Sequence, residues 1–454
     1  MSKGTVTRLR DLGTWSGGNT PSKANTAYWT GGTVPWVSPK DMKVDEIVSS
    51  EDHITNTALA DGRVSLISEG SVLFVTRSGI LAHTFPVAVT KLAVTINQDL
   101  KALTPKPGIS PKYVAHAVRG ASRRILKECS KHGTTVASVD TNALLDFEIP
   151  LVNLDEQHRI VAEIEKQFSR LDEAVAGLKR VKANLKRYKA AILKAAVEGR
   201  LVPTEADHAR REGRNYETGA QLLAGMIQER QAHRIGKGKK TDAIAPKTAG
   251  LSELPIGWAW ASVEELGRLQ LGRQRAPKYH SGANMRPYLR VQNVFEDRID
   301  LSDVMEMDFS EADFERFALH AGDILLNEGQ SPELLGRPAM YRGEISGVCF
   351  TNTLIRFQAY RCVLPEFALI VFRHYMHAGR FVDESNITTN IAHLSLGRLS
   401  TVEFPVPPLP EQHRIVAEVD RLLSIARESE AEVETNLKRA QALRQSILGA
   451  AFSG

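Results

Sequence analysis

The most one-sided charge in the sequence is a basic run in its first half. From Lys179 to Lys194 there are seven lysine or arginine residues and no acidic residue. Because a solvated helix face usually carries both signs of charge, this run indicates a surface that faces phosphate groups or an acidic partner. The residues in it that could make such contacts are Lys182, Lys186, Arg187 and Lys189.

The sequence lacks the motifs of the common catalytic sites. It has no Walker motif, no HExxH and no GxSxG, and its only Pro-Pro pair, Pro407-Pro408, is followed by leucine instead of the aromatic residue of an amino-methyltransferase motif. His158 and His413 recur at matching helix starts, where packing or subunit contact is favoured over catalysis. We therefore expect no catalytic residue and no metal ligand, although the many acidic residues leave an unorthodox nuclease site open.

Length and composition are typical of a globular protein with several domains. The 454 residues allow about three domains, or two with a large connector. The net charge of +5 permits a polyanionic partner, and the three cysteines contain no CxxC pair, which excludes a cysteine-rich zinc site. Since no apolar run is long enough to span a membrane and no secretory signal begins the chain, we expect a cytoplasmic protein without membrane association.

An internal repeat organises the chain. The octapeptide EQHRIVAE occurs at 156–163 and again at 411–418, and the match continues over 44 aligned positions with 16 identities. A weaker match, shifted by 252 residues, aligns PWVSPKDM (35–42) with PYLRVQNV (287–294). Two divergent copies of one module are the simplest explanation of this collinear series.

Each copy begins with a stretch of about 150 residues that predicts an α/β or α+β domain. Short apolar, β-rich runs indicate strands, and longer apolar segments that begin with proline indicate helices. The expected strands cover 71–76, 85–90, 323–327 and 353–360, and the expected helices cover 111–130 and 365–382.

Each copy ends in a long helix with a coiled-coil seam. Apolar residues recur in steps of three and four from Ile164 to Ile192, and from Val419 to Ile447 with one step of seven between Ala426 and Val433. Two copies related by a pseudo-two-fold axis would pair these helices antiparallel and place them between the two globular domains. The predicted division is a first globular domain at 1–150, a central helix at 151–200, a connector at 201–257, a second globular domain at 258–405 and a C-terminal helix at 406–454.

The connector is polar and irregular in sequence. It contains one helix candidate at 219–234 and then the basic segment GKGKKTDAIAPK. A solvated basic linker is the default expectation for it, with a weak contact to DNA or to a partner left open.

The repeated segments resemble a known family. IPLVNLDEQHRIVAEIE and FPVPPLPEQHRIVAEVD, each followed by a helix that ends in an ILxAA sequence, are similar to the DNA-specificity subunit of type I restriction–modification systems. LSELPIGWAWASVEELG (251–267) resembles that family's entry to a second target-recognition domain. The similarity extends over essentially the whole chain, with the repeated helical segments matching specifically and the recognition domains only in outline.

The resemblance implies a fold and a set of partners. The fold would be two α/β (α+β) target-recognition domains separated by a pair of long antiparallel coiled-coil helices. Each domain would read half of a split, asymmetric target in double-stranded DNA, and the helices would set the gap. Two adenine-N6 methyltransferase subunits, which use S-adenosylmethionine, and two motor-nuclease subunits, which use ATP and Mg, would assemble on a chain that itself carries no cofactor or catalytic residue.

Aligned loops of the two copies supply the candidate contacts. Arginine can bond guanine and glutamine or asparagine can bond adenine, so unlike side chains at equivalent positions suit two unlike half-sites. The candidate DNA-binding residues are Ser38, Lys40, Asp41, Arg77, Ser78, Lys131, His132, Thr134 and Thr135 in the first copy, and Arg290, Gln292, Asn293, Asn327, Glu328, Gln330, Asn386, Thr388 and Asn390 in the second. The candidate docking residues are those of the repeated turn, Glu156, Gln157, His158, Arg159, Glu411, Gln412, His413 and Arg414, whose apolar neighbours are explained equally well by capping of the bundle.

Two other functions remain open on the sequence. The chain could be a coiled-coil scaffold that joins two protein-binding domains, or a stand-alone DNA-modifying enzyme. Sequence-selective DNA binding and a methyltransferase partner would argue against the scaffold, and activity of the purified chain on DNA would favour the enzyme.

Overall fold

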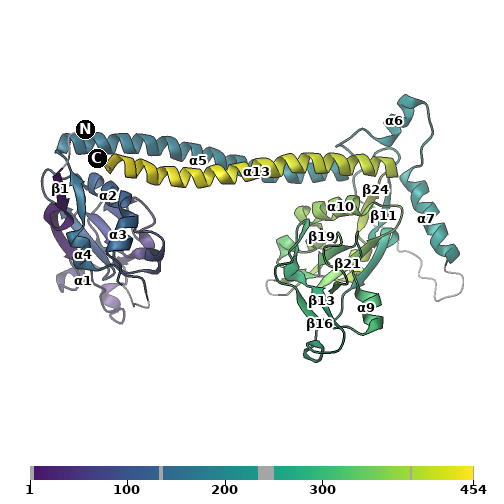
Figure 1. Ribbon diagram of the computed structural model, residues 1–454, viewed down its shortest axis with the longest axis horizontal. Coiled ribbons are helices and arrows are strands. Elements are labelled where there is room, and N and C mark those ends of the chain that lie inside the picture. Colours follow the sequence, from purple (N-terminus) through teal and green to yellow (C-terminus); the bar gives the residue numbers. More distant parts are fainter. Residues whose placement is uncertain (1–4, 132–135, 234–249, 389–390, 453–454) are drawn as a thin grey trace. The chain divides into compact units, whose positions relative to one another are not determined.

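The structure is a computed structural model that describes residues 5–131, 136–233, 250–388 and 391–452. Contacts within the chain divide it into two compact units, residues 1–180 with 433–454, and residues 181–432. Each unit contains one globular domain and one half of each of two long helices, α5 (Leu154–Val197) and α13 (Leu409–Phe452) (Figure 1).

The first globular domain is built on short strands that pair mostly antiparallel. Its sheets have the strand orders β2-β9-β6-β7-β4 and β5-β3-β8, and β1 pairs with β10. The expected strands at 71–76 and 85–90 are β6 and β7, and both are buried throughout. The strands are β1 (Thr5–Arg8), β2 (Gly13–Gly17), β3 (Val34–Val37), β4 (Glu46–Ile47), β5 (Asp52–Ile54), β6 (Val72–Val75), β7 (Val87–Thr90), β8 (Thr95–Ile96), β9 (Leu100–Pro105) and β10 (Glu148–Leu151).

Helices cover one side of this domain. Ser110 caps the start of α2 (Pro111–Gly120) by accepting a hydrogen bond from the N–H of Tyr113 at 3.4 Å, and the proline occupies the first helical position, where no N–H is needed. The single helix expected over 111–130 is therefore two, because α2 ends at Gly120 and α3 (Ser122–Glu128) follows. The remaining helices are α1 (Asn56–Ala60) and α4 (Thr141–Asp146).

The second globular domain repeats this plan. The strand order β12-β21-β17-β19 matches β2-β9-β6-β7, the order β16-β13-β20 matches β5-β3-β8, and β11 pairs with β24 as β1 does with β10. The parallel pairs also correspond, since Trp36 lies opposite Thr95 and Tyr288 lies opposite Cys349, which confirms the 252-residue shift between Trp36 and Tyr288. The strands are β11 (Ala259–Ser262), β12 (Gly267–Leu271), β13 (Met285–Leu289), β14 (Val294–Phe295), β15 (Arg298–Ile299), β16 (Met305–Asp308), β17 (Ile324–Asn327), β18 (Gly329–Gln330), β19 (Pro338–Met340), β20 (Cys349–Phe350), β21 (Leu354–Ala359), β22 (Ser385–Thr388), β23 (Ile391–Leu394) and β24 (Glu403–Val406).

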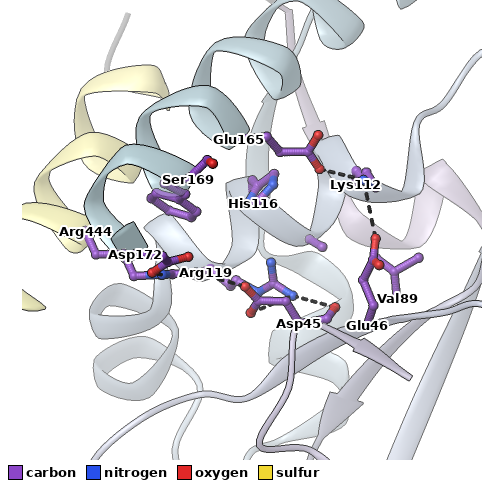
Figure 2. Close-up of a pocket in the computed structure, with 12 residues that line it drawn as sticks. Asp45, Glu46, Val89, Lys112, His116, Arg119, Glu165, Ser169, Asp172 and Arg444 are labelled. Atoms are coloured by element: carbon purple, nitrogen blue, oxygen red, sulfur yellow. Dashed lines mark hydrogen bonds and ion pairs between the residues drawn. The ribbon is translucent and has the colours of Figure 1, made fainter. Parts of the chain in front are cut away.

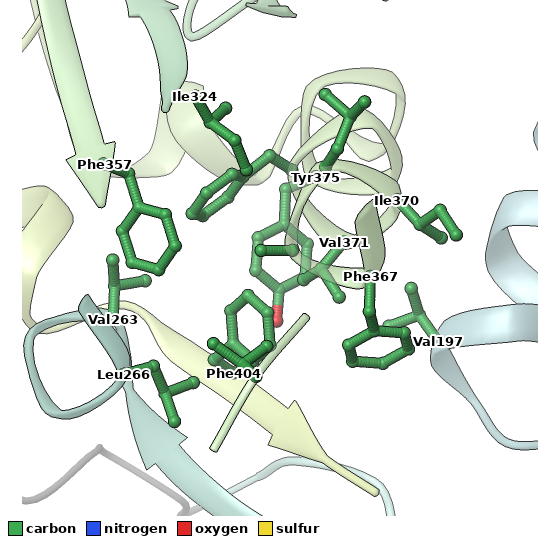
Figure 3. Packing of buried hydrophobic residues seen from close by; sticks show 14 of the residues in the cluster. Val197, Val263, Leu266, Ile324, Phe357, Phe367, Ile370, Val371, Tyr375 and Phe404 are labelled. Atoms are coloured by element: carbon green, nitrogen blue, oxygen red, sulfur yellow. The ribbon is translucent and has the colours of Figure 1, made fainter. Parts of the chain in front are cut away.

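Aromatic residues fill the core of the second unit. Phe372 packs edge-on against Phe357 and Phe404, with ring centroids 5.1 and 5.9 Å apart. Val197 of α5 belongs to the same buried cluster, so the long helix is part of the core of this unit (Figure 3). The helices of the domain are α8 (Val263–Leu266), α9 (Glu311–Phe317), α10 (Pro365–Ala378), α11 (Arg380–Asp383) and α12 (Leu396–Ser400), so the helix expected over 365–382 is also divided in two.

The two long helices pack antiparallel in each unit, as the heptad pattern predicts. In the first unit, Ile164 and Phe168 of α5 form a buried cluster with Leu448 of α13. In the second unit, the Lys189 Nζ of α5 lies 2.7 Å from the Glu430 carboxylate of α13. Both helices lie inside the ranges 151–200 and 406–454 that the sequence indicated.

The connector differs from the expected solvated linker over its described part. It forms two helices, α6 (Glu205–Glu212) and α7 (Gly219–His233), of which the sequence indicated only the second. Met226 of α7 is buried in the core of the second unit. The basic segment GKGKKTDAIAPK lies outside the described residues.

Cys129, Cys349 and Cys362 are all buried, as expected for small apolar side chains. Across the described ranges, no helix is long and apolar enough to cross a membrane.

Candidate DNA interface and docking turns

The first candidate loop of the first domain contains a 3-10 helix, η3 (Pro39–Asp41), that is held by its own side chains. Asp41 accepts hydrogen bonds from the N–H of Ser38 at 2.8 Å and from its hydroxyl at 3.1 Å. Ser38 is buried and Asp41 is half-buried, so these two residues shape the loop, and base contacts by them stay untested predictions. Lys40 is exposed, and its hydrogen bond to Asp52 at 3.0 Å raises its pKa.

The equivalent loop of the second domain, η6 (Val291–Asn293), has the same construction. Asn293 accepts a hydrogen bond from the N–H of Arg290 at 3.0 Å and donates one to the carbonyl oxygen of Asp303 at 2.9 Å. It is buried and its amide is hydrogen-bonded within the loop, and a base contact by Asn293 stays an untested prediction. Gln292 is exposed, and Arg290 forms an ion pair with Asp303.

The second candidate loop of the first domain starts directly after the buried strand β6. Arg77 is exposed, and its backbone bridges to Ser138 across the loop. Ser78 accepts a long hydrogen bond of 3.5 Å from the N–H of Ile80, and it caps a 3-10 turn. Arg77 is therefore the residue of this loop whose side chain is best placed to reach a ligand.

The equivalent loop of the second domain contains a buried amide. Asn327 is fully buried, and neither its Oδ1 nor its Nδ2 has a hydrogen-bond partner within the described residues. A base contact by Asn327 stays an untested prediction. Glu328 lies 3.4 Å from the His393 ring, and Gln330 accepts a hydrogen bond from the N–H of Ser331 at 3.2 Å.

The third candidate segment is described only in part. Lys131 is exposed and lies 3.5 Å from the Asp140 carboxylate. Asn386 and Thr388 belong to β22, of which only the backbone is described. The remaining candidates, His132, Thr134, Thr135 and Asn390, lie outside the described residues.

The basic run lies on α5. Lys182, Lys186 and Arg187 are exposed along the helix. Lys189 pairs with Glu430, so its charge is already matched within the chain. A phosphate contact therefore stays a prediction that rests most directly on Lys186 and Arg187.

The glutamine of the repeated EQHR turn forms hydrogen bonds that stabilise the structure around it. Gln157 is 1% exposed, and its carboxamide accepts a hydrogen bond from the N–H of Ser110 at 2.8 Å. It donates to the carbonyl oxygens of Val152 at 2.8 Å and Gly108 at 3.2 Å. These bonds join the start of α2 to the start of α5.

Gln412 makes the same three bonds in the second unit. It accepts from the N–H of Leu364 at 2.8 Å and donates to the carbonyl oxygens of Cys362 and Pro407, both at 3.0 Å. Burial leaves neither glutamine available to a partner, so the docking prediction applies to the exposed members of the turn, His158, Arg159 and His413.

The glutamates of the two turns have different surroundings. Glu156 forms a two-pronged ion pair with Arg159 of its own helix. Glu411 is fully buried, and it accepts hydrogen bonds from the indole N–H of Trp258 at 2.9 Å and the backbone N–H of Glu205 at 2.8 Å.

The connector therefore covers the second turn. The carboxylate of Glu205 lies 2.7 Å from Arg414, and burial raises the pKa of Glu411. Neither Glu205 nor Trp258 was identified from the sequence, although a helix start after Thr204 was a usable signal for the first. Glu411 and Arg414 are engaged within the chain.

A charged pocket of about 620 Å³ lies between the first globular domain and the helix pair of the same unit (Figure 2). Lys112 pairs with both Glu46 and Glu165, and Arg119 pairs with Asp45. This pairing of opposite charges suits a structural junction better than a catalytic site. Within the described ranges, no group of three ligating side chains is placed to hold a metal ion.

His116 is the unusual member of this pocket. Its ring packs edge-on against Phe168 with centroids 5.8 Å apart, and its Nδ1 has no partner in the described part of the chain. Burial, followed by the neighbouring charge of Arg119, lowers the pKa of His116 to about 4. The imidazole is therefore neutral at physiological pH and acts as a packing group.

Comparison with known proteins identifies the family to which this repeated fold belongs. The model of the type I restriction modification DNA specificity domain matches residues 1–186 and 262–439. The chain belongs to this family.

Individual relatives agree with this assignment. The specificity subunit of the type I restriction enzyme EcoR124I/EcoR124II from Escherichia coli is 40% identical over 172 residues, which are 38% of this chain and 43% of that subunit. The MjaIX specificity subunit from Methanocaldococcus jannaschii is 30% identical over 34% of this chain and 35% of its own length. The chain thus spans less than half the length of these curated relatives in the matched regions.

Solved structures share the fold. The HsdS subunit from Thermoanaerobacter tengcongensis is 18% identical with a TM-score of 0.56, and the match covers 100% of this chain and 97% of that one. A chain from work on complex assembly and conformational transition of the type I R-M system has a TM-score of 0.65 at 18% identity and covers 100% and 98%. The expected fold class, two mixed α/β domains with long paired helices, is confirmed.

Proposed function

We propose that this chain is the non-catalytic DNA-specificity subunit of a type I restriction–modification complex. One observation carries the proposal: the chain contains the same domain fold twice, and equivalent loop positions hold different side chains. Lys40 in the first domain corresponds to Gln292 in the second, and both are exposed. Two like scaffolds with unlike surface residues suit a bipartite, asymmetric target in double-stranded DNA, read one half by each domain.

The proposed partners follow from the family. Two adenine-N6 methyltransferase subunits bind S-adenosylmethionine, and two motor-nuclease subunits bind ATP and Mg, so this chain needs no cofactor of its own. The exposed residues of the repeated turn, His158, Arg159 and His413, are the proposed docking contacts. The complex works on cytoplasmic DNA.

Methylation mapping tests the proposal directly. The chain is co-expressed with the methyltransferase encoded beside its gene in a host without DNA methylation, and N6-methyladenine is mapped across the genome. We expect a split motif with a fixed gap. A stable complex that methylates no defined motif would contradict the proposed role, and failure to form any complex would favour a scaffold.

A domain exchange tests the division of labour. Replacement of residues 1–150 by the equivalent domain of a relative should change one half of the mapped motif and leave the other half and the gap unchanged. A change in both halves would contradict independent reading by the two domains. The parent chain, mapped in the same host, is the control.

A further inference from the structure

An acidic residue connects one candidate DNA-binding loop to the helix pair of its unit. This loop contains η3 and is here called the first reading loop; the loop that contains η6 is the second reading loop. Asp45 lies four residues after the end of η3, and its carboxylate lies 3.2 Å from Arg119 of α2 and 3.1 Å from Arg444 of α13. Arg444 also pairs with Asp172 of α5 at 2.7 Å, and its guanidinium lies over the Phe168 ring at 4.1 Å. Figure 2 shows this series of contacts from α5 through α13 to the loop and α2.

Arg119 binds the backbone of this loop as well as the Asp45 carboxylate. Its Nη2 donates to the carbonyl oxygen of Asp45 at 3.0 Å and to that of Val87 at 2.8 Å. The end of α2 in turn lies directly against α13, because Gln445 donates to the carbonyl oxygens of Arg119 and Gly120 at 3.3 and 3.2 Å. The position of the loop is thus set by two residues of α13.

The second unit contains the corresponding acidic residue. Asp297 lies four residues after the end of η6, and its carboxylate lies 3.2 Å from Arg373 of α10 and 3.7 Å from Arg427 of α13. Arg119 and Arg373 are both the ninth residue of helices that begin with Pro111 and Pro365. The acidic residue and its helical arginine are therefore equivalent in the two copies.

The second junction has further features of a fixed contact. Asp297 has a φ of 55°, which makes it the one non-glycine residue with positive φ among the described residues. Asp297 lies in the two-residue turn of the β14–β15 hairpin, in which Phe295 pairs with Arg298, and aspartate adopts this conformation in turns more readily than most residues. Arg342 also binds Asp297 at 3.2 Å, and Arg373 binds Glu296 at 3.0 Å.

In both units the arginine from the long helices belongs to α13. Symmetry between the copies alone would place one of them on α5, since position 427 corresponds to position 172 under the 255-residue shift. In both units the acidic residue is thus paired with an arginine of α13, but the two arginines occupy non-equivalent positions in the repeat. A contact that is retained with different geometry indicates that the link itself matters.

We propose that Arg444 and Arg427 are positioning residues that hold the two reading loops at a fixed angle to the helix pair, and so set the number of base pairs accepted between the two half-sites. The inference rests on the proposed function, and it concerns the gap alone. The half-site sequences are read by other side chains of the same loops, such as Lys40 and Gln292.

The expected effect is modest for each arginine. Their side chains are 37% and 57% exposed, and ion pairs between exposed groups typically contribute little. Each removed contact should therefore lower the preference for the natural gap over a gap one base pair longer or shorter by about two- to fivefold. The double variant should lose more, because both loops are released.

The test uses the full chain in complex with its methyltransferase. Binding is measured on duplexes that carry both half-sites with the mapped gap, or with one base pair added or removed. The variants are Arg444→Gln, Arg427→Gln and the double substitution, and Arg444→Lys should retain part of the preference. Arg421→Gln is the matched control, because Arg421 is an arginine of α13 whose partner, Glu418 at 2.7 Å, lies on the same helix.

The outcomes separate the possibilities. A reduced gap preference with unchanged half-site sequences supports the inference. Folded variants with the natural gap preference would overturn it, and so would an equal loss of affinity on all three duplexes, which identifies a phosphate contact instead. If the unsubstituted complex shows no bipartite preference at all, the proposed function itself fails.

Discussion

Gln157 and Gln412 make the same three hydrogen bonds at equivalent places in the two units. Each accepts the backbone N–H of the residue that precedes a proline-led helix, and each donates to two carbonyl oxygens. The segment that is most alike in the two copies thus forms a structural connection between a globular domain and a long helix. Similarity between the copies identified the turn, and the structure shows that its glutamine is buried and bonded within each unit.

Gln412→Ala should destabilise the second unit. The substitution leaves the N–H of Leu364 and two carbonyl oxygens without partners in a buried setting, which costs about 1–3 kcal/mol. The measurement is urea unfolding of the full chain, with Gln441→Ala as the control because Gln441 is an exposed residue of the same helix. A loss below about 0.5 kcal/mol would contradict the structural role.

Glu411→Gln and Glu156→Gln should have unequal effects although the positions are equivalent. A glutamine at 411 turns its NH₂ group toward the N–H of Trp258 or of Glu205, so one buried donor loses its acceptor. We expect a loss of about 1–3 kcal/mol in the free energy of unfolding. At 156, a solvent-screened pair with Arg159 is removed, and the loss should be clearly smaller than at 411. Equal losses would contradict the covered environment of Glu411.

The first unit should become less stable as the pH falls, because of the protonation of His116. The pKa of His116 is about 4 in the folded chain, below the ordinary value of 6.5, because burial favours the neutral ring. The unfolded chain therefore takes up a proton first, so stability is complete above pH 6.5 and is lost as the pH falls toward 4. Between pH 7 and pH 5 the loss should be about 2 kcal/mol.

Unfolding in urea at these two pH values tests this prediction. His116→Gln should reduce the pH-dependent loss, and the part that remains should include His374, whose pKa burial also lowers. The same pH dependence in wild type and His116→Gln would assign the effect to other groups.

Arg290→Ala should lower specific DNA binding by about 1–3 kcal/mol and relax one base position of the target. In the free chain Arg290 is paired with Asp303, so Asp303→Asn should release it and strengthen binding. Lys186→Ala is the contrasting variant. Removal of an exposed lysine that contacts phosphate should weaken binding equally on all DNA sequences. An unchanged base preference in Arg290→Ala would remove this residue from the set of readers.

Much of the architecture was predictable from patterns. Heptad spacing located both long helices, and buried β-rich runs located β6, β7, β17 and β21. The helices at 111–130 and 365–382 were expected as single elements. The end of α10 at Gly379, which has a left-handed conformation, was a local signal that could have been used, whereas α2 ends against α13. That end is a tertiary contact, which local periodicity cannot report.

The candidate sites were less predictable for the same reason. Asn293 and Asn327 have side chains that suit base recognition, but both are buried, and burial depends on how the loop folds back on its domain. The paired residues Asp45 and Arg119 carry no motif, since their 74-residue separation has no local signal. Only the second copy, with Asp297 and Arg373, shows that this pair is a repeated feature.

The antiparallel pairing of the first and last strands of each domain has a consequence for inheritance. Thr5 lies opposite Leu151, and Ala259 lies opposite Val406, so each domain is entered and left through one two-stranded ribbon. A genetic exchange with crossovers in these two short strands would transfer a complete reader while the donor and recipient helices keep their register. On the proposed function, new specificities would therefore arise by recombination of whole coding segments, without a series of intermediates that recognise nothing.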